Sequence, residues 1–173
     1  MKIHFTGIKG VGMTPLAILA KEAGFVVSGS DVGEIFITDA ALKKAGIVPL
    51  VGFSAKHVER ADLVITTGAH GGFDNPEVKA ALEKNIPVIP QGKAVGMVMD
   101  GSLFDVAKEG IAVAGCHGKT TTTAMIATIL VEAGLDPSYV IGTSSIEPIG
   151  LPGHFGKGKY FIAEADEYMT MPG

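Results

Sequence analysis

Short apolar runs alternate with helical patterns along most of the chain, and this alternation constrains the fold more than any other feature. Apolar runs at residues 3–5, 25–27 and 63–67 are each followed by glycine-rich or polar residues and then by helical spacing. Strands joined through helices by short connections form parallel sheets with helices on both faces. The runs are continuously apolar, as expected for strands buried on both sides. The sequence therefore predicts an α/β fold.

Small residues mark where the predicted helices begin and end. Ala-Gly pairs at residues 23–24, 45–46 and 133–134 each close a helical stretch, and an apolar residue follows each pair. Glycine favours the left-handed conformation that ends many helices. A further helix at residues 76–84 starts on proline, with Asn75 as its cap and an asparagine as its stop. The other elements predicted in this half are helices at residues 11–23, 37–45 and 91–99 and strands at 47–51 and 86–89.

The rhythm changes between residues 90 and 110, where a second strand–loop–helix unit begins. We predict two domains, residues 1–100 with a Rossmann-like parallel sheet and residues 110–173 as the start of a P-loop α/β domain. The second part is short for a complete nucleotide-binding domain, so we expect the chain to be part of something longer. Its predicted elements are strands near 111–114, 139–142 and 159–163 and a helix near 119–133.

Composition excludes several classes of protein. The 173 residues carry 14 Lys and Arg against 18 Asp and Glu, a net charge of −4, which provides no basic field for nucleic acid. The single cysteine cannot form an intrachain disulfide. No run approaches the roughly 18 apolar residues of a membrane helix, and the N-terminus resembles no signal peptide. We therefore expect a cytoplasmic protein that acts without a membrane or nucleic acid.

A first glycine-rich turn directly follows the first predicted strand and opens the first helix. Gly7, Gly10 and Gly12 would let the backbone approach a diphosphate at the helix N-terminus. Asp31 follows the second strand, where a ribose is bound in doubly wound sheets. A turn without a ligand, and a capping or solvated role for Asp31, remain alternatives. The G-x-x-G-x-G spacing differs from the G-x-G-x-x-G of dinucleotide enzymes, which disfavours an NAD-dependent oxidoreductase.

A second glycine-bordered turn carries a stronger phosphate-binding signal. A strand leads into Gly115, and Gly118-Lys119-Thr120 then opens a helix. In such loops the backbone amides hold phosphates, the lysine reaches the β- and γ-phosphates and the hydroxyl meets Mg²⁺. The full Walker pattern would need glycine at Val113, so this loop is a shortened version. A chance Gly-Lys-Thr at a helix start is the alternative.

Three acids follow the last predicted strand. Glu164, Asp166 and Glu167 stand at its C-terminal end, which is the ligand edge of a parallel sheet. Carboxylates at that edge can hold Mg²⁺ beside the phosphates of a nucleotide. A solvated acidic loop is the alternative.

The remaining nucleophiles and metal ligands suggest no second chemistry. Adjacent residues rarely present their side chains to each other, so Cys116 and His117 are not expected to form a catalytic pair. The other histidines lack metal-ligand spacing and are expected to be structural or exposed, although His70 lies in a loop at a strand's C-terminal end. These other histidines are His4, His57, His70 and His154.

Taken in this order, the three motifs resemble the Mur ligase family, the ATP-dependent amino-acid ligases of bacterial peptidoglycan synthesis. The likeness covers nearly the whole chain and is most specific in its last two segments. One departure is Cys116, where the family usually has threonine. The resembling segments are residues 7–14, 28–31, 74–89, 115–125 and 158–168.

The resemblance implies a three-domain enzyme, of which this chain would hold the UDP-binding domain and the opening of the ATP-binding domain. It implies catalytic roles for Lys119 and Glu164, and a Mg²⁺ site formed by Thr120 and Glu164. The implied UDP contacts are Gly7, Gly10, Gly12 and Asp31, and the implied ATP contacts are Gly115, His117, Gly118, Lys119, Thr120 and Thr121.

The reaction implied by the resemblance is the ATP- and Mg²⁺-dependent ligation of L-alanine to UDP-N-acetylmuramate through an acyl phosphate. This reaction belongs to peptidoglycan biosynthesis and so to cell-wall formation, cell shape and division. Two alternatives remain: the family member that attaches recycled tripeptide to UDP-N-acetylmuramate, and a UDP-sugar-binding module without turnover. The chain alone is not expected to be active.

Overall fold

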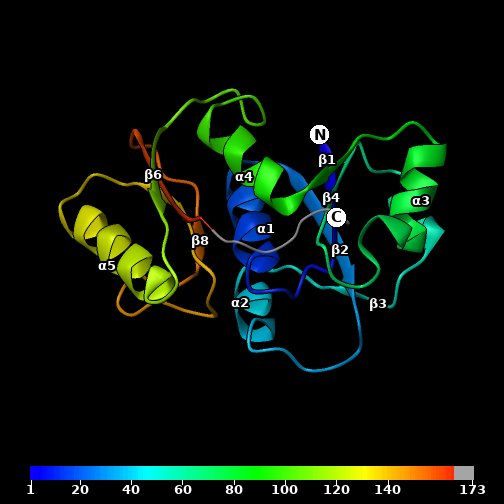
Figure 1. Cartoon of the computed structure of the whole chain (residues 1–173), viewed down its shortest axis with the longest axis horizontal. Helices are drawn as coiled ribbons and strands as arrows, with labels where there is room; N and C mark the ends of the chain where they lie inside the picture. The colour runs from blue at the N-terminus through cyan, green and yellow to red at the C-terminus, as the bar shows by residue number, and fades with distance from the viewer. Residues whose placement is uncertain (166–173) are drawn as a thin grey trace.

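The computed structural model describes residues 1–165 as two β-sheets flanked by helices, which confirms the predicted α/β class (Figure 1). The first sheet has five strands in the order β3-β2-β1-β4-β5, and the second has four in the order β6-β9-β7-β8. The elements around the first sheet are β1 (Lys2–Thr6), α1 (Met13–Glu22), β2 (Val26–Asp31), α2 (Asp39–Lys44), β3 (Leu50–Val51), η1 (Ala55–Val58), β4 (Leu63–Thr66), η2 (Gly72–Asp74), α3 (Pro76–Glu83), β5 (Val88–Pro90) and α4 (Gln91–Met99). The elements of the second are β6 (Glu109–Val113), α5 (Lys119–Glu132), β7 (Ser138–Val140), β8 (Gly153–His154) and β9 (Tyr160–Glu164).

The first sheet is parallel throughout and places the end of β1 at its centre. β1 pairs with β2 on one side and with β4 on the other, so that Thr6 lies opposite both Ser30 and Thr66. The strand order reverses between β1 and β4, and ligands of doubly wound sheets bind in the crevice at such a switch point. The glycine turn that follows β1 therefore opens at the expected ligand edge.

The core of the first sheet is built from uninterrupted apolar strands and from α1. Ile3 and Phe5 of β1, Ile65 of β4 and Leu16 and Leu19 of α1 are all fully buried. Burying such side chains supplies most of the free energy that stabilises a domain. Among residues 1–165, no helix is long and apolar enough to cross a lipid bilayer.

The predicted helix ends are confirmed by the backbone. Gly24, Gly46 and Gly134 have φ angles of 92°, 66° and 72°, and each directly follows the C-cap residue of a helix. The amide after each glycine donates back to a carbonyl of the last helical turn, as in a Schellman motif. Asn85, the predicted stop after α3, is also left-handed, with φ 57°. At the other end of α3, Asn75 Oδ1 accepts from the amide of Glu77 at 2.9 Å, which confirms the predicted cap.

The second sheet combines three parallel strands with one antiparallel edge. β9 lies between β6 and β7 and runs parallel to both, whereas the two-residue strand β8 pairs antiparallel with β7. The sequence does not predict β8, because two residues are too few to form an apolar run. The predicted strand at 47–51 is likewise shorter, since only Leu50 and Val51 pair with β2.

The two faces of the second sheet are buried by different helices. Tyr139 and Ile162 belong to a cluster that contains Ala127 of α5. Val140 and Phe161, which alternate with them, belong to the same cluster as the residues of α1. The first helix of the chain thus packs on both sheets. The predicted domain limits, residues 1–100 and 110–173, stay a prediction.

A histidine between two carboxylates ties α1 to the second sheet. His154 Nδ1 lies 2.7 Å from Glu22 Oε2 at the end of α1, and His154 Nε2 lies 3.0 Å from Asp136 Oδ1. Ionised carboxylates only accept hydrogen bonds, so the protonated imidazole, which donates from both ring nitrogens, is the form that satisfies both contacts. The amide of Phe155 also donates to Glu22 Oε2, at 3.0 Å. We call the His154, Glu22 and Asp136 side chains the inter-sheet clamp.

The pKa shifts in the inter-sheet clamp follow from these contacts. The hydrogen bond to Glu22, helped by the one to Asp136, raises the pKa of His154 above 6.5 against the opposing effect of burial. Burial raises the pKa of Glu22, but the bonds from His154 and Phe155 outweigh it and leave that pKa below 4.5. The bonds from the Lys157 amide and from His154 lower the pKa of Asp136 below 3.8. All three groups are therefore stabilised in their charged forms.

We predict that the inter-sheet clamp stabilises the fold most between about pH 4.5 and pH 6.5. The contribution of His154 is complete below its unfolded pKa of 6.5 and is lost as the pH rises through the higher folded value. The contribution of Glu22 is complete above 4.5 and is lost as the pH falls through the lowered value. Thermal unfolding of the wild-type chain and of His154→Gln measures the effect. The Tm difference should be larger at pH 6 than at pH 8.5, and equal differences would contradict the prediction.

Candidate functional site

The first glycine turn, residues 7–12, is folded tightly onto the end of β2. The amides of Gly7 and Ile8 both donate to the carbonyl of Ser30, at 2.9 and 3.1 Å. Gly7 has φ 80°, and a Cβ on it would stand 2.5 Å from Cγ2 of Thr67. Both its conformation and the close approach of Thr67 therefore require glycine here. Gly12 is the N-cap residue of α1, so the turn leads directly into the helix.

The Asp31 carboxylate is hydrogen-bonded to the backbone of this turn. Its side chain is fully buried, and Oδ2 accepts from the amide of Lys9 at 2.7 Å while Oδ1 accepts from the amide of Val32 at 2.8 Å. His70 Nε2 lies 3.4 Å from Asp31 Oδ1. The carboxylate therefore fixes the turn and also draws the 67–72 loop towards it. Its predicted contact with the uridine side of a ligand stays a prediction.

The outer part of the turn keeps hydrogen-bond donors for an anion. Within residues 1–165, the amides of Val11 and Gly12 donate to no protein acceptor. They stand at the N-terminus of the ten-residue α1, where the aligned peptide dipoles favour negative charge. Gln91, from the start of α4, lies over the turn and donates to the carbonyl of Gly12 at 3.4 Å. The arrangement suits a diphosphate.

The second glycine turn connects β6 to α5, as predicted from the sequence. Gly115 and Gly118 have φ angles of 149° and 75°, and Gly118 is the N-cap residue of α5. Lys119 Nζ donates to the carbonyl of Gly115 at 3.0 Å, so its side chain folds back along the turn. Cys116 and His117 form the exposed outer part. The two glycines with positive φ and the position between a strand and a helix agree with the predicted shortened loop, whose contacts with ATP stay a prediction.

Thr120 and Glu164 meet beside this turn although 44 residues separate them. The Thr120 hydroxyl donates to Glu164 Oε2 at 2.9 Å, and the amide of Gly142 donates to Oε1 at 2.7 Å. A hydroxyl and a carboxylate oxygen are the hard ligands that Mg²⁺ prefers. The donor set therefore fits the predicted metal site. Asp166 and Glu167, the other two acids of this motif, lie outside the described residues.

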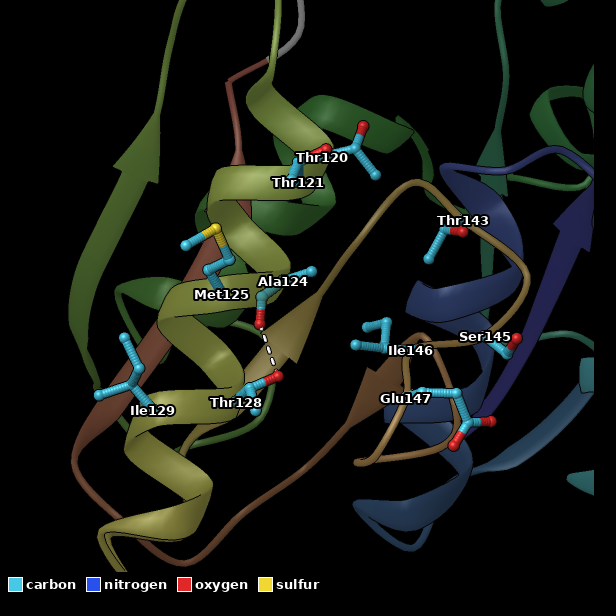
Figure 2. Close-up of a pocket in the computed structure, with 10 residues that line it drawn as sticks. All are labelled: Thr120, Thr121, Ala124, Met125, Thr128, Ile129, Thr143, Ser145, Ile146 and Glu147. Carbon is cyan, nitrogen blue, oxygen red and sulfur yellow. Dashed lines mark hydrogen bonds between the residues drawn. The ribbon is translucent and has the colours of Figure 1, made fainter.

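A cavity of about 470 Å³ adjoins the same end of α5 (Figure 2). Thr120 and Thr121 stand at its upper end on α5, and the loop of residues 143–147 forms the opposite wall. Further along α5, Met125 and Ile129 contribute apolar surface. Thr121, a predicted ATP contact, therefore faces this cavity rather than the interior of the protein.

Sequence reasoning missed several residues that shape the two turns. The amide of Gly142 orients Glu164, Gln91 covers the first turn, and His70 reaches Asp31. Only His70 carried a signal, because it lies in a glycine-rich loop at the end of a strand. Gln91 and Gly142 have no local pattern that marks them. Their roles depend on which strand ends become neighbours.

Comparison with known proteins places these features in a family. The model of the Mur ligase family, catalytic domain, matches residues 2–103. A UDP-N-acetylmuramate–L-alanine ligase from Desulfitobacterium hafniense is 46% identical over 169 residues, which is 97% of this chain and 36% of the relative. The ligase of the same name from Neisseria meningitidis serogroup C is 47% identical over 165 residues, 95% of this chain and 33% of the relative. The chain thus spans about a third of the length of these curated relatives.

Solved structures agree with this result. The UDP-N-acetylmuramate–alanine ligase from Thermotoga maritima matches with a TM-score of 0.78 and 34% identity, over 95% of this chain and 37% of that one. The UDP-N-acetylmuramate:L-alanyl-gamma-D-glutamyl-meso-diaminopimelate ligase from Neisseria meningitides has the same TM-score, 0.78, and 33% identity, over 98% of this chain and 53% of that one. The two glycine turns on two sheets agree with the family model and with these relatives, which show that the chain belongs to the Mur ligase family.

Proposed function

We propose that this chain is the nucleotide-binding portion of a ligase that joins L-alanine to UDP-N-acetylmuramate at the expense of ATP. The observation that carries the proposal is the pair of glycine turns. Each turn follows the C-terminal end of a strand and leads into a helix, and the two strands belong to different sheets. Curated relatives at 46% and 47% identity carry the name of this reaction, which favours it over attachment of a recycled tripeptide.

Each turn is assigned one anion. Residues 1–100 would bind the UDP part of the substrate, with Gly7, Gly10 and Gly12 at the diphosphate and Asp31 on the uridine side. Residues 110–173 would open the ATP-binding unit. There, Gly115, His117, Gly118, Lys119, Thr120 and Thr121 would contact the phosphates. The amides of Val11 and Gly12, which are free within residues 1–165, support an anion at the first turn. The Lys119 side chain, which lies along the second turn, supports an anion there.

A magnesium ion would be held by Thr120 and Glu164, whose oxygens already lie 2.9 Å apart. Bound there, the metal would neutralise charge on the phosphates of ATP. The protein's own part is to orient its ligands. The Gly142 amide fixes one oxygen of Glu164, which leaves the other directed at Thr120. Lys119 supplies a fixed positive charge next to the transferred phosphate.

In the proposed reaction, a carboxylate oxygen of UDP-N-acetylmuramate attacks the γ-phosphorus of ATP. The bond to the bridging oxygen breaks, which yields an acyl phosphate and ADP. The amine of L-alanine then attacks the acyl carbon, loses a proton and expels inorganic phosphate. Catalysis of this kind depends on positioning and on charge stabilisation. Holding the two nucleotides at two turns of one chain would provide the positioning.

Isothermal titration of the chain with three ligands tests the proposal. We expect UDP-N-acetylmuramate and Mg²⁺-ATP each to bind with one-to-one stoichiometry and without competing, because the two turns belong to different sheets. NAD serves as the control ligand, and we expect it not to bind at the first turn because the glycine spacing differs from that of dinucleotide enzymes. Competition between UDP-N-acetylmuramate and NAD would contradict the assignment of the first turn.

A further inference from the structure

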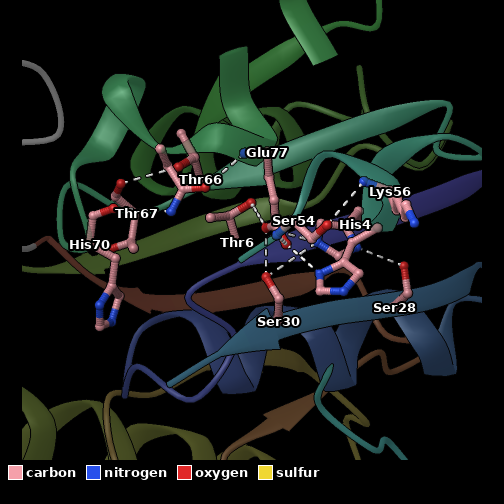
Figure 3. Close-up of polar contacts among 12 residues, drawn as sticks. His4, Thr6, Ser28, Ser30, Ser54, Lys56, Thr66, Thr67, His70 and Glu77 are labelled. Atoms are coloured by element: carbon pink, nitrogen blue, oxygen red, sulfur yellow. Dashed lines mark hydrogen bonds and ion pairs between the residues drawn. The ribbon is translucent and has the colours of Figure 1, made fainter. Parts of the chain in front are cut away.

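A fully buried carboxylate lies beneath the first turn and has no role in the function described so far. Glu77 stands in the first turn of α3, and its side chain is 0% exposed. Figure 3 shows it directed away from α3 towards the ends of β1 and β2. The groups donating to its carboxylate are the Thr6 hydroxyl at 2.9 Å, the Ser30 hydroxyl at 2.6 Å, His4 Nε2 at 3.2 Å, the Ser54 amide at 3.2 Å and His57 Nδ1 at 2.7 Å.

These contacts keep Glu77 ionised. Burial alone would raise its pKa, but the hydrogen bonds from His4, Ser30 and His57 outweigh burial and lower the pKa to about 2. Among residues 1–165, every fully buried side-chain nitrogen or oxygen has a hydrogen-bond partner, so this group is fully paired. Replacing the carboxylate would leave several buried donors without an acceptor, which is costly in a protein interior.

Two of the five donors belong to the residues that anchor the first turn. Thr6 is the last residue of β1 and directly precedes Gly7. Ser30 uses its hydroxyl to reach Glu77 and its carbonyl to accept from the amides of Gly7 and Ile8. One carboxylate thus bridges the ends of two strands that are also paired with each other in the sheet. The first turn is attached to β2 by the hydrogen bonds from the amides of Gly7 and Ile8 to the carbonyl of Ser30, at 2.9 and 3.1 Å.

We infer that Glu77 is a positioning residue for binding of the nucleoside diphosphate. This inference rests on the proposed function, in which residues 7–12 hold the UDP part of the substrate. Glu77 acts only through Thr6 and Ser30, which determine where the donors of the turn point. A residue with a merely structural role would affect the stability of the fold but not the affinity of the folded protein for UDP.

Two pairs of variants separate these roles. Ser30→Ala removes the hydroxyl that links Glu77 to the turn but keeps the carboxylate and the backbone carbonyl. Ser28→Ala is its matched control, because Ser28 lies two residues earlier on β2 and contacts only the far side of the network, with Oγ 3.0 Å from His4 Nδ1. Glu77→Gln removes the charge itself. Its control is Glu83→Gln, an exposed site on the same helix.

The measurement is the dissociation constant for UDP, by titration well below the Tm of each variant, with Mg²⁺-ATP as a second ligand. We expect Ser30→Ala and Glu77→Gln to bind UDP about tenfold more weakly. We expect both controls to match the wild type, and all four variants to bind ATP unchanged. If Glu77→Gln does not fold, Ser30→Ala carries the test.

Unchanged UDP affinity in folded Ser30→Ala and Glu77→Gln would overturn the inference and leave the proposed function standing. Equal weakening of UDP and ATP binding would overturn it too, because it would indicate general loss of structure. Failure of the wild-type chain to bind UDP would overturn the proposed function, and this inference with it.

Discussion

Replacing Lys119 with alanine is expected to weaken Mg²⁺-ATP binding by roughly a hundredfold while leaving UDP-N-acetylmuramate binding unchanged. The Lys119 ammonium lies along the second turn, 3.0 Å from the carbonyl of Gly115. A charge-assisted hydrogen bond to phosphate is among the stronger contacts in proteins, and the variant removes it completely. The first turn belongs to another sheet and keeps its own donors.

Matched variants make this test specific. Lys43→Ala removes the same charge from an exposed position in the last turn of α2, and we expect it to bind both ligands like the wild type. Lys119→Arg keeps the charge but replaces a compact ammonium with a planar fork, so we expect it to recover ATP affinity only in part. Wild-type ATP affinity in Lys119→Ala would show that the second turn is not the ATP site.

A large loss of stability is expected from Gly153→Ala, at the contact between α1 and β8 of the second sheet. A Cβ on Gly153 would stand 2.0 Å from the carbonyl oxygen of Pro15 and 2.7 Å from its carbonyl carbon. Both atoms belong to the backbone of α1, which cannot turn aside as a flexible side chain can. Relieving the overlap would require β8 and α1 to move apart, so we expect the free energy of unfolding to fall by roughly 3 kcal/mol.

Gly96→Ala is the matched control for this prediction. Gly96 lies inside α4, and a Cβ there would meet nothing within 4 Å. Alanine is favoured over glycine in a helix, so this variant should gain about 0.5–1 kcal/mol. Thermal unfolding should therefore give a Tm for Gly153→Ala roughly 10 °C below that of the wild type. The Tm of Gly96→Ala should equal that of the wild type or be slightly higher. Similar Tm values for both variants would refute the close packing of α1 on β8.

Elements with strong local signals were predictable from the sequence. The sequence predicts a helix at 91–99, and α4 spans Gln91–Met99. The predicted Asn75 cap and the left-handed Gly24, Gly46 and Gly134 are also confirmed. Each of these depends on residues within one or two helical turns. The edges of the sheets were less predictable. β3 and β8 have only two residues each, and such short strands exist because a neighbouring strand is there to pair with.

The same division holds for the second glycine turn: its local residues were predictable, and its long-range contacts were not. The second turn could be identified because Gly115, Gly118 and Lys119 are close in sequence and require the strand and helix that flank them. The strand-end rule also placed Glu164 at the same edge as Thr120. The rule could not supply the 2.9 Å hydrogen bond between them or the Gly142 amide that orients the carboxylate.

Local backbone preferences and apolar periodicity are therefore enough to predict the alternation of the longer strands and helices, the two glycine turns and the places where helices end. Contacts between distant groups become visible only in the folded chain, where Glu77 meets Ser30, 47 residues away, and His154 meets Glu22, 132 residues away. Hydrogen bonds between distant side chains depend on strand register and helix packing to within a few tenths of an ångström, and a local pattern of residues does not specify distances between elements to that precision.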